Sequence, residues 1–320
     1  MTNDIIAAVL PSFIIAFVGY YYSTKDTKLD LKSIANLIYY IFSPCMVYSS
    51  LAQQGFQRSE FTQLGVSVVV LIFSLVLVTW FYVKVTSFPS KGIYLPIIFM
   101  NTGNVALPMS LFLYGQDGLS KAIMFHLVNV LFLYTMGVFI VSRRTNIKEF
   151  FKIPFVYAGV LGILVAKSPV KLPGGIAPYA AMVNSTIDII GKGAIPLLIL
   201  SLGYSLKRTK IADLKHGITG AGIRVILGPL IAFGLVAFFR YIGWSPTGAG
   251  YSHAVLKSAR TTEAIIVLMG AMPAPIMSFL LNEKFDECPE IAASMVLMGT
   301  IAGIATIPMV LILIQRFIMT

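Results

Sequence analysis

The stretch Asn101-Thr102-Gly103-Asn104-Val105-Ala106-Leu107-Pro108 interrupts an apolar run that extends from Gly92 to Tyr114. That run is long enough to cross a bilayer, because a membrane helix needs roughly 20 apolar residues. Proline removes one backbone hydrogen bond and clashes with the preceding turn. Inside a membrane, freed backbone groups are tolerated only where protein or water covers them. The stretch therefore predicts a membrane helix that is broken at Pro108 and borders a polar cavity near the membrane midplane.

The rest of the chain has the composition of a membrane protein. Its 320 residues are 57% hydrophobic and 12% charged, whereas soluble domains have about 25% charged residues. The mean hydropathy is +0.85. We predict an all-α polytopic membrane protein with ten transmembrane helices. Apolar length and helix-breaking residues place them at roughly 4–23, 32–54, 62–84, 92–115, 119–142, 153–167, 177–205, 216–241, 254–282 and 289–316.

The charge and the cysteines exclude other classes of protein. The net charge is +11, but the basic residues are scattered among short loops and form no basic face, so nucleic acid is not expected as a partner. Cys45 and Cys288 fit no metal or redox spacing. We expect neither a metal nor a cofactor. No cleavable signal is expected either, because Asp4 leads directly into an apolar run.

Loop charges predict the orientation. Fourteen basic residues lie on one side of the predicted topology, namely Lys25, Lys28, Lys32, Lys84, Lys91, Arg143, Arg144, Lys148, Lys152, Lys207, Arg208, Lys210, Lys215 and Lys284. The opposite side has eight, namely Arg58, Lys121, Lys167, Lys171, Arg240, Lys257, Arg260 and Arg316. The side with more positive charge normally faces the cytoplasm. We therefore predict a multi-pass protein of the cell membrane with both termini outside the cytoplasm.

Internal similarity predicts an inverted repeat. Helices one to five would form a first copy over residues 1–142, and helices six to ten a second copy over 153–320. Residues 143–152 would be a cytoplasmic linker. An odd number of helices per copy inverts the second copy, as in many transporters. Ser43-Pro44 in helix two has its counterpart in Ile195-Pro196 of helix seven.

The fourth and ninth helices share the strongest similarity. Ala106-Leu107-Pro108-Met109-Ser110 corresponds to Ala274-Pro275-Ile276-Met277-Ser278, with the prolines one place apart, and Pro273 adds a second breaker to the ninth helix. Two interrupted helices in equivalent positions of two halves are the best sequence pointer to a substrate site at the midplane. We expect the two breaks to lie at the same depth.

At these residues the chain resembles the auxin efflux carrier family, which includes bacterial and archaeal members and the plant PIN-type carriers. The resemblance rests on Asn101–Pro108 and extends to Gly193–Leu198, Ser201–Gly203, Ile223-Arg224 with Pro229, Ala271–Pro275, Ala292–Ser294 and Thr306–Pro308. It implies ten helices in a five-plus-five inverted repeat, with helices four and nine crossing at their breaks. It also implies transport of organic anions such as auxin, malate or malonate.

The crossing is the first candidate binding site. Unpaired N–H groups at a helix start carry a partial positive charge and suit a carboxylate. Asn101 and Asn104 would add neutral hydrogen-bonding groups, although both side chains would also be explained if they only satisfied the broken backbone. The candidate substrate-binding residues here are Asn101, Gly103, Asn104, Pro108, Met272, Pro273 and Pro275, with Ser43 and Pro44 from helix two.

Asp188 and Lys192 form a second candidate. They are four residues apart in helix seven and hence lie on one helix face. A charge at a membrane helix centre costs ~2.5–3.5 kcal/mol on insertion scales, so such residues normally face a cavity and pair. We expect a buried pair. It could be structural, Lys192 could hold an anion, or Asp188 could take up a coupling ion. Lys192 departs from the family pattern, in which a small or apolar residue is usual.

Five other polar residues have structural interpretations. Arg224 lies inside helix eight, which favours an internal anchor. Arg260 and Glu263 open helix nine, where a solvated helix entrance is expected. His126 and Asn129 are three residues apart in helix five and could form bonds between helices.

These observations predict a secondary transporter, an efflux carrier of small organic anions that works by alternating access, with one bundle moving against another. One alternative is a cation/proton or sodium-coupled antiporter or symporter on the same ten-helix plan, which would need adjacent membrane carboxylates. A membrane enzyme is disfavoured, because the chain has no H-E-x-x-H motif or paired aspartates. The identity of the anion, the coupling ion (H⁺ or Na⁺) and the oligomeric state, monomer or homodimer, are left open.

Overall fold

The computed structural model describes residues 2–25, 30–53, 58–86, 91–142, 154–167, 177–206, 214–246 and 250–319, and within them all regular structure is helical. In the N-terminal half the helices are α1 (Thr2–Lys25), α2 (Leu31–Leu37), η1 (Ile38–Phe42), α3 (Ser43–Gln53), α4 (Arg58–Thr86), η2 (Lys91–Ile93), α5 (Tyr94–Ile98), η3 (Thr102–Ala106), α6 (Leu107–Phe132), η4 (Leu133–Gly137) and α7 (Val138–Ser142). In the C-terminal half they are α9 (Pro154–Lys167), α10 (Ala177–Lys192), α11 (Ala194–Leu206), α12 (Leu214–Tyr241), α13 (His253–Gly270), α14 (Ile276–Phe285), α15 (Pro289–Ile314) and η5 (Gln315–Met319).

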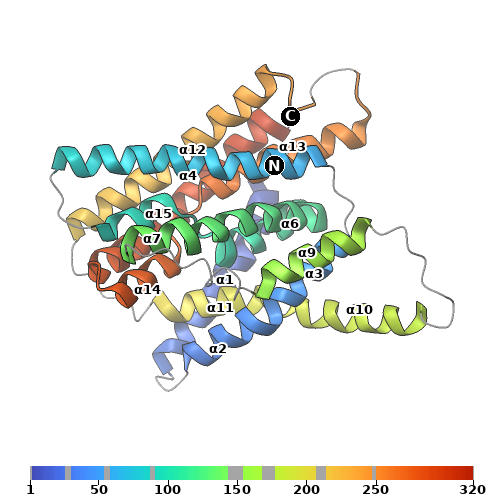
Figure 1. Cartoon of the computed structure of the whole chain (residues 1–320), viewed down its shortest axis with the longest axis horizontal. Coiled ribbons are helices and arrows are strands. Elements are labelled where there is room, and N and C mark those ends of the chain that lie inside the picture. The colour runs from blue at the N-terminus through green and yellow to red at the C-terminus, as the bar shows by residue number, and fades with distance from the viewer. Residues whose placement is uncertain are drawn as a thin grey trace.

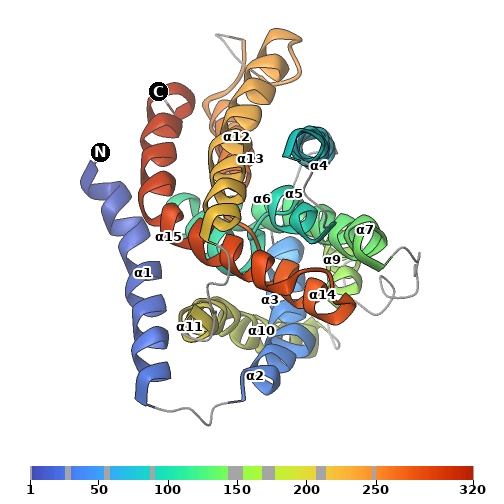
Figure 2. The ribbon, with the colours of Figure 1, turned by 90° about the vertical axis from the view of Figure 1, so that its left-hand side faces the viewer.

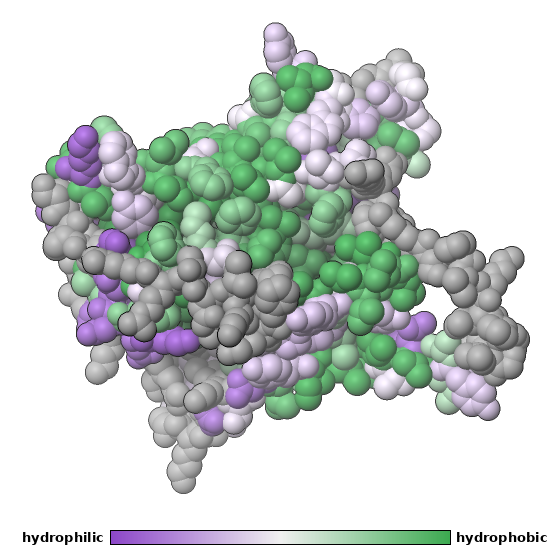
Figure 3. All heavy atoms as spheres, in the orientation of Figure 1, coloured by the Kyte–Doolittle hydropathy of each residue, from purple (hydrophilic) through white to green (hydrophobic). Residues whose placement is uncertain are grey.

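The chain is a multi-pass membrane protein. Six helical spans of the described residues are long and apolar enough to cross a membrane, namely Ser33–Gln53, Ser59–Thr86, Lys91–Ser142, Pro178–Tyr204, Leu214–Tyr241 and Pro289–Met319. Val156–Ala166 is a shorter apolar helix. Apolar side chains cover most of the face that Figure 3 shows, and hydrophilic residues gather toward its edges. The count of ten membrane helices and the inverted repeat stay predictions.

The span Lys91–Ser142 reverses direction within α6. Gly115 has a positive φ of 65° and a ψ of −155° there, which favours glycine because a side chain would be strained. The two arms then lie side by side, since Asn129 Nδ2 donates a hydrogen bond of 3.2 Å to the carbonyl oxygen of Met100. This reversal falls where the sequence predicts the boundary between the segments 92–115 and 119–142.

The helices form two groups. Helices α1, α2, α3, α9, α10 and α11 pack on one another, and we call them the small bundle. Helices α4 to α7 and α12 to α15, with η3, form the crossover bundle. Figures 1 and 2 show α2, α3, α10 and α11 on the opposite side of the molecule from α4, α12 and α13. The two groups meet where η3 and α6 contact α1, α3 and α11.

Glycines let the helices of the small bundle approach closely. A β-carbon on Gly203 of α11 would overlap the carbonyl oxygen of Ala16 in α1. A β-carbon on Gly191 would lie 2.8 Å from Met46 of α3, at the junction of α10 and α11. Small residues at helix contacts are typical of membrane bundles. Helices two and seven of the predicted topology therefore pack against each other beside Ser43 and Pro44.

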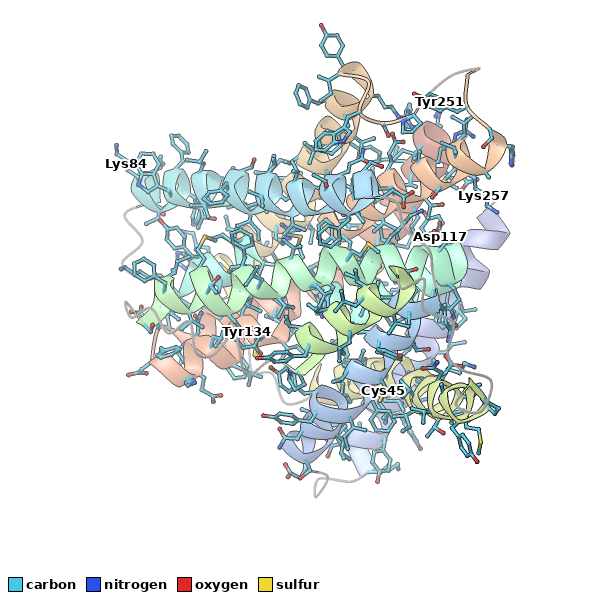
Figure 4. All side chains as sticks on the ribbon, turned by 45° about the vertical axis from the view of Figure 1, so that its right-hand side comes forward. Cys45, Lys84, Asp117, Tyr134, Tyr251 and Lys257 are labelled. Atoms are coloured by element: carbon cyan, nitrogen blue, oxygen red, sulfur yellow. The ribbon has the colours of Figure 1, made fainter. Side chains whose placement is uncertain are left out.

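Polar contacts tie the helices of the crossover bundle together at one end. Lys121 Nζ is buried and contacts Asp117 at 2.8 Å and Ser258 Oγ at 2.7 Å, and Ser258 Oγ donates to Glu60 at 2.6 Å. Figure 4 places Asp117 at the end of the molecule opposite Lys84. In the predicted topology the cluster end is extracytoplasmic.

The solvated helix entrance expected at Arg260 and Glu263 is wrong for Glu263, whereas Arg260 is partly exposed. Glu263 is 1% exposed, and its carboxylate accepts hydrogen bonds from Arg240 Nε at 3.0 Å and from Ser245 Oγ at 2.5 Å. Arg260 Nη1 donates to the carbonyl oxygen of Met319 at 3.1 Å. Both residues are bound to neighbouring helices because α12 and η5 pack on α13, a contact that segment order alone does not specify.

Candidate functional site

The first broken helix opens earlier than its proline. Helix α5 ends at Ile98, and the chain is extended at Phe99 (φ −91°, ψ 153°) before η3 begins at Thr102. Pro108 lies within the first two positions of α6, where proline is well tolerated. The opening predicted at Pro108 is therefore displaced to Phe99–Asn101. Pro108 cannot donate to the carbonyl oxygen of Asn104, four residues before it, and the wide π-helical turn η3 directly precedes α6.

The second break meets the first. Helix α13 ends at Gly270, and α14 starts after Pro275, which has an extended conformation (φ −77°, ψ 147°) and provides no side-chain cap. The backbone N–H of Asn101 donates a hydrogen bond of 2.8 Å to the carbonyl oxygen of Pro273. The two breaks therefore cross, and the crossing joins residues 172 positions apart. This contact between the two breaks agrees with the predicted crossing of the two interrupted helices.

Arg224 of α12 holds the second break in place. Its side chain is fully buried, with 0% exposed. Nε donates to the carbonyl oxygen of Met272 at 3.0 Å, and Nη2 donates to that of Gly270 at 2.5 Å. These carbonyls have lost their helical partners because α13 ends there. The internal anchor predicted for Arg224 is confirmed, and Met272 contributes through its backbone, since its own side chain is buried.

The two asparagines of the first break have different surroundings. Asn101 is 4% exposed, and its Oδ1 accepts a hydrogen bond of 3.2 Å from the backbone N–H of Asn104. Asn101 therefore caps η3 and satisfies the broken backbone. The side chain of Asn104 is only partly buried and has no hydrogen-bond partner among the described residues. Asn101 Nδ2 is buried without a described partner, so what distinguishes Asn104 is that its amide is the more accessible of the two.

We expect Asn101→Ala to destabilise the protein by about 1 kcal/mol, because removing a helix-capping side chain typically costs 0.5–2 kcal/mol. Thermal unfolding in detergent would measure this loss. Asn104→Ala is the matched control, since it removes the same group three residues further on without removing a described hydrogen bond. Equal stability of the two variants would show that the Asn101 cap contributes nothing.

Two polar side chains of α6, His126 and Asn129, contact the residues of the first break. Thr102 Oγ1 is 2.7 Å from His126 Nδ1, and Asn129 Nδ2 donates to Thr102 Oγ1 at 3.1 Å. A β-carbon on Gly103 would be 3.2 Å from His126 Cε1, so the ring packs against the broken helix at the position where the backbone is bare. The predicted bonds between helices at His126 and Asn129 are confirmed.

A cavity of about 190 Å³ lies where the two bundles meet. Its wall comes from α1, α3 and the α10–α11 junction on one side and from α6 on the other. The lining residues are Ile15, Met46, Ser49, Ser50, Leu111, Phe112, Gln116, Leu119, Asp188, Gly191, Lys192, Ile195 and Pro196. Most of these side chains are apolar, so the few polar groups would orient a ligand.

Asp188 and Lys192 are the two charged residues in this wall. Lys192 Nζ is 2.7 Å from Asp188 Oδ2, which confirms the predicted pairing and the predicted contact with a cavity. The expected burial of both charges is wrong, because the Lys192 side chain is 69% exposed and that of Asp188 is 29% exposed. The reason is that the pair lies in the cavity wall and Lys192 is in the last turn of α10, so packing leaves both side chains partly exposed.

The structure separates the candidate residues into two places. Asn101, Gly103, Asn104, Pro108, Met272, Pro273 and Pro275 lie at the crossing, and none of them lines the cavity. Ser43 and Pro44 begin α3 and do not line it either; Ser49 and Ser50 lie there instead. Sequence reasoning missed these two serines and Gln116. The available signal was that Ser49 and Ser50 follow Ser43-Pro44 in the same predicted helix.

An interrupted membrane helix whose break meets the break of a second helix is typical of membrane transporters. Comparison with known proteins agrees. The profile of the membrane transport protein family matches residues 4–149 and 139–312, and the chain belongs to this family, which includes the auxin efflux carriers.

Two relatives are named as transporters of unassigned substrate. An uncharacterised transporter of Methanocaldococcus jannaschii is 21% identical over 312 residues, which cover 93% of this chain and 94% of the relative. An uncharacterised transporter of Methanothermobacter thermautotrophicus is 25% identical over 231 residues, 68% of this chain and 66% of the relative. These names support a transporter and leave the substrate unspecified.

Proposed function

We propose that the protein is a secondary transporter of small organic anions, such as auxin-like carboxylates or dicarboxylates, and that it works by alternating access in the cell membrane. The hydrogen bond between Asn101 N and Pro273 O carries the proposal, because it brings two helix starts to one point. The first turns of η3 and α14 then offer backbone N–H groups and a partial positive charge. A carboxylate is the ligand that such a point favours.

Side chains around the crossing support the same ligand. Asn104 has an amide without a described partner, and it can donate to one carboxylate oxygen. Arg224 keeps α13 and its break fixed through Gly270 and Met272, so the site would be held ready before the ligand binds. Between the two bundles, Lys192 supplies a full positive charge in the cavity wall.

The position of the cavity supports movement of one bundle against the other. The cavity lies between the small bundle and α6 of the crossover bundle. Movement of the crossover bundle against α1, α3 and α11 would open the crossing first to one side of the membrane and then to the other, which is the general scheme of alternating access. The predicted orientation, with both termini outside, belongs to this proposal. The coupling ion, H⁺ or Na⁺, is to be decided by experiment.

A thermal-shift screen of the purified protein against small carboxylates, with and without sodium, tests the proposed function. A ligand that binds only the folded state stabilises it by about 2.7 kcal/mol at a concentration of 100 times its Kd. We expect at least one carboxylate to raise the unfolding temperature in a concentration-dependent way, and neutral amides of the same acids to have no effect. Equal shifts with acids and amides, or no shift with any acid, would contradict anion transport.

A further inference from the structure

The two charged side chains in the cavity wall, Asp188 and Lys192, have different numbers of hydrogen-bond partners. Asp188 Oδ1 accepts hydrogen bonds from Ser49 Oγ at 2.7 Å and from Gln53 Nε2 at 3.4 Å, both from α3. Its Oδ2 accepts from Lys192. Lys192 has three N–H donors, and Asp188 is its sole described partner. Its side chain is also the more exposed one. Asp188 is therefore fixed to α3, whereas Lys192 can move.

We propose that Asp188 acts as a built-in competitor for anions: its carboxylate holds Lys192 while the cavity is empty and releases it to the carboxylate of an entering substrate. The proposal rests on the proposed function, because it assigns a role within anion transport. The Lys192 ammonium is largely exposed, but it borders a mostly apolar cavity wall, where a nearby counter-charge stabilises it. Asp188 supplies one at 2.7 Å, so the charge of Lys192 is compensated while the cavity is empty.

The geometry explains how the exchange would occur. When Lys192 turns toward an anion, Asp188 keeps its two donors from α3, so neither carboxylate is left without hydrogen bonds. The other groups that α1, α3, α6 and α11 present to the cavity carry no charge: they are Ile15, Ser50, Gln116 and Pro196 among others. The affinity for an anion would then depend on how strongly the substrate competes with Asp188 for the single ammonium group of Lys192.

Two consequences follow for substrate binding. Removing the charge of Asp188 should strengthen anion binding, because the competitor is lost. Removing Lys192 should weaken it, because the cation is lost. A merely structural salt bridge predicts neither, since breaking it from either side would act on stability in the same direction.

The first experiment measures the cavity charge without any substrate. In a background with Cys45 and Cys288 replaced by alanine, Lys192→Cys is labelled with anionic 2-sulfonatoethyl methanethiosulfonate and with its cationic trimethylammonium analogue. Adding Asp188→Asn should raise the anionic rate and lower the cationic rate by about five-fold each, the effect of one charge about 4 Å away in water, so their ratio should rise roughly 30-fold. A rate ratio that does not respond to Asp188, or a thiol that neither reagent reaches, would overturn the proposal.

The second experiment measures malonate binding by calorimetry. Asp188→Asn should bind malonate about two- to five-fold more tightly than the wild type, and Lys192→Met roughly ten- to a hundred-fold more weakly. Asp117→Asn is the matched control: Asp117 and Lys121 are also a pair four residues apart, at 2.8 Å, but neither lines the cavity. We expect unchanged affinity there.

The outcomes separate this proposal from the proposed function. Weaker or unchanged malonate binding in Asp188→Asn, with normal binding in the wild type, would overturn the competitor role and leave anion transport standing. If no variant binds malonate or any other carboxylate while the labelling rates respond to Asp188, the proposed function fails. The charge-dependent access of anions to Lys192 would still be supported.

Discussion

Replacing Arg224 with methionine is expected to lower the stability of the protein by roughly 2–6 kcal/mol, the largest effect that we expect of any single substitution. Methionine fits the apolar surroundings but donates no hydrogen bond. The carbonyl groups of Gly270 and Met272 would then be buried without the partners they now have, at roughly 1–3 kcal/mol each. These acceptors belong to the backbone, so no compensating substitution can remove them.

Thermal unfolding in detergent would measure this loss. Lys84→Met is the control, because it removes a charge from the exposed last turn of α4. Arg224→Lys should be intermediate, since an ammonium group keeps the charge but cannot reproduce the planar fork of the guanidinium group. If Arg224→Met unfolds within about 1 kcal/mol of the wild type, Arg224 does not hold the break, and the crossing is stabilised by packing alone.

The second large effect is expected on binding. Asn104→Ala should weaken carboxylate binding about five- to a hundred-fold while the protein stays folded. The fold should survive because the Asn104 side chain has no described partner, and Asn101 Oδ1 caps its backbone N–H instead. Loss of one hydrogen bond in a buried site costs roughly 1–3 kcal/mol, which corresponds to that range of affinity.

Calorimetry with the carboxylate that gives the largest thermal shift would measure the change. Asn104→Asp serves as a charge control: a carboxylate at this position should repel the anion and weaken binding more than alanine does. A well-folded Asn104→Ala variant with an unchanged Kd would place the site away from the crossing. The cavity that Lys192 lines would then be the remaining candidate.

Much of the fold could be predicted because membrane helices obey strong local rules. Apolar length and helix breakers located the segments, and Gly115 marks the reversal between two of them. The breaks were predictable for the same reason, since prolines, asparagines and glycine in an apolar run are costly unless they line or support a cavity. The position of the first opening along the chain could not be predicted, because η3 accommodates Pro108 and the extended residues lie at Phe99–Asn101 instead.

The site could be predicted only in part. The Asp188–Lys192 pair followed from a spacing of four residues, which any helix translates into one face. The exposure of Lys192 and the hydrogen bond from Ser49 to Asp188 could not be predicted from this spacing, because they depend on how α3 and α6 lie against α10. The burial of Glu263 was missed for the same reason: its partner Arg240 comes from a different helix, 23 residues away in the chain.

Local chemistry is therefore what the amino-acid order specifies here: where the helices run, where they break, and which charges share a face. The partners across helices were settled by packing. Asn101 and Pro273 meet across 172 residues, and Arg224 reaches the end of α13 from α12. No spacing rule connects such positions. Their contacts form because the membrane interior contains no water to bind the groups of a broken backbone or a buried charge. Each such group therefore needs a partner on a neighbouring helix.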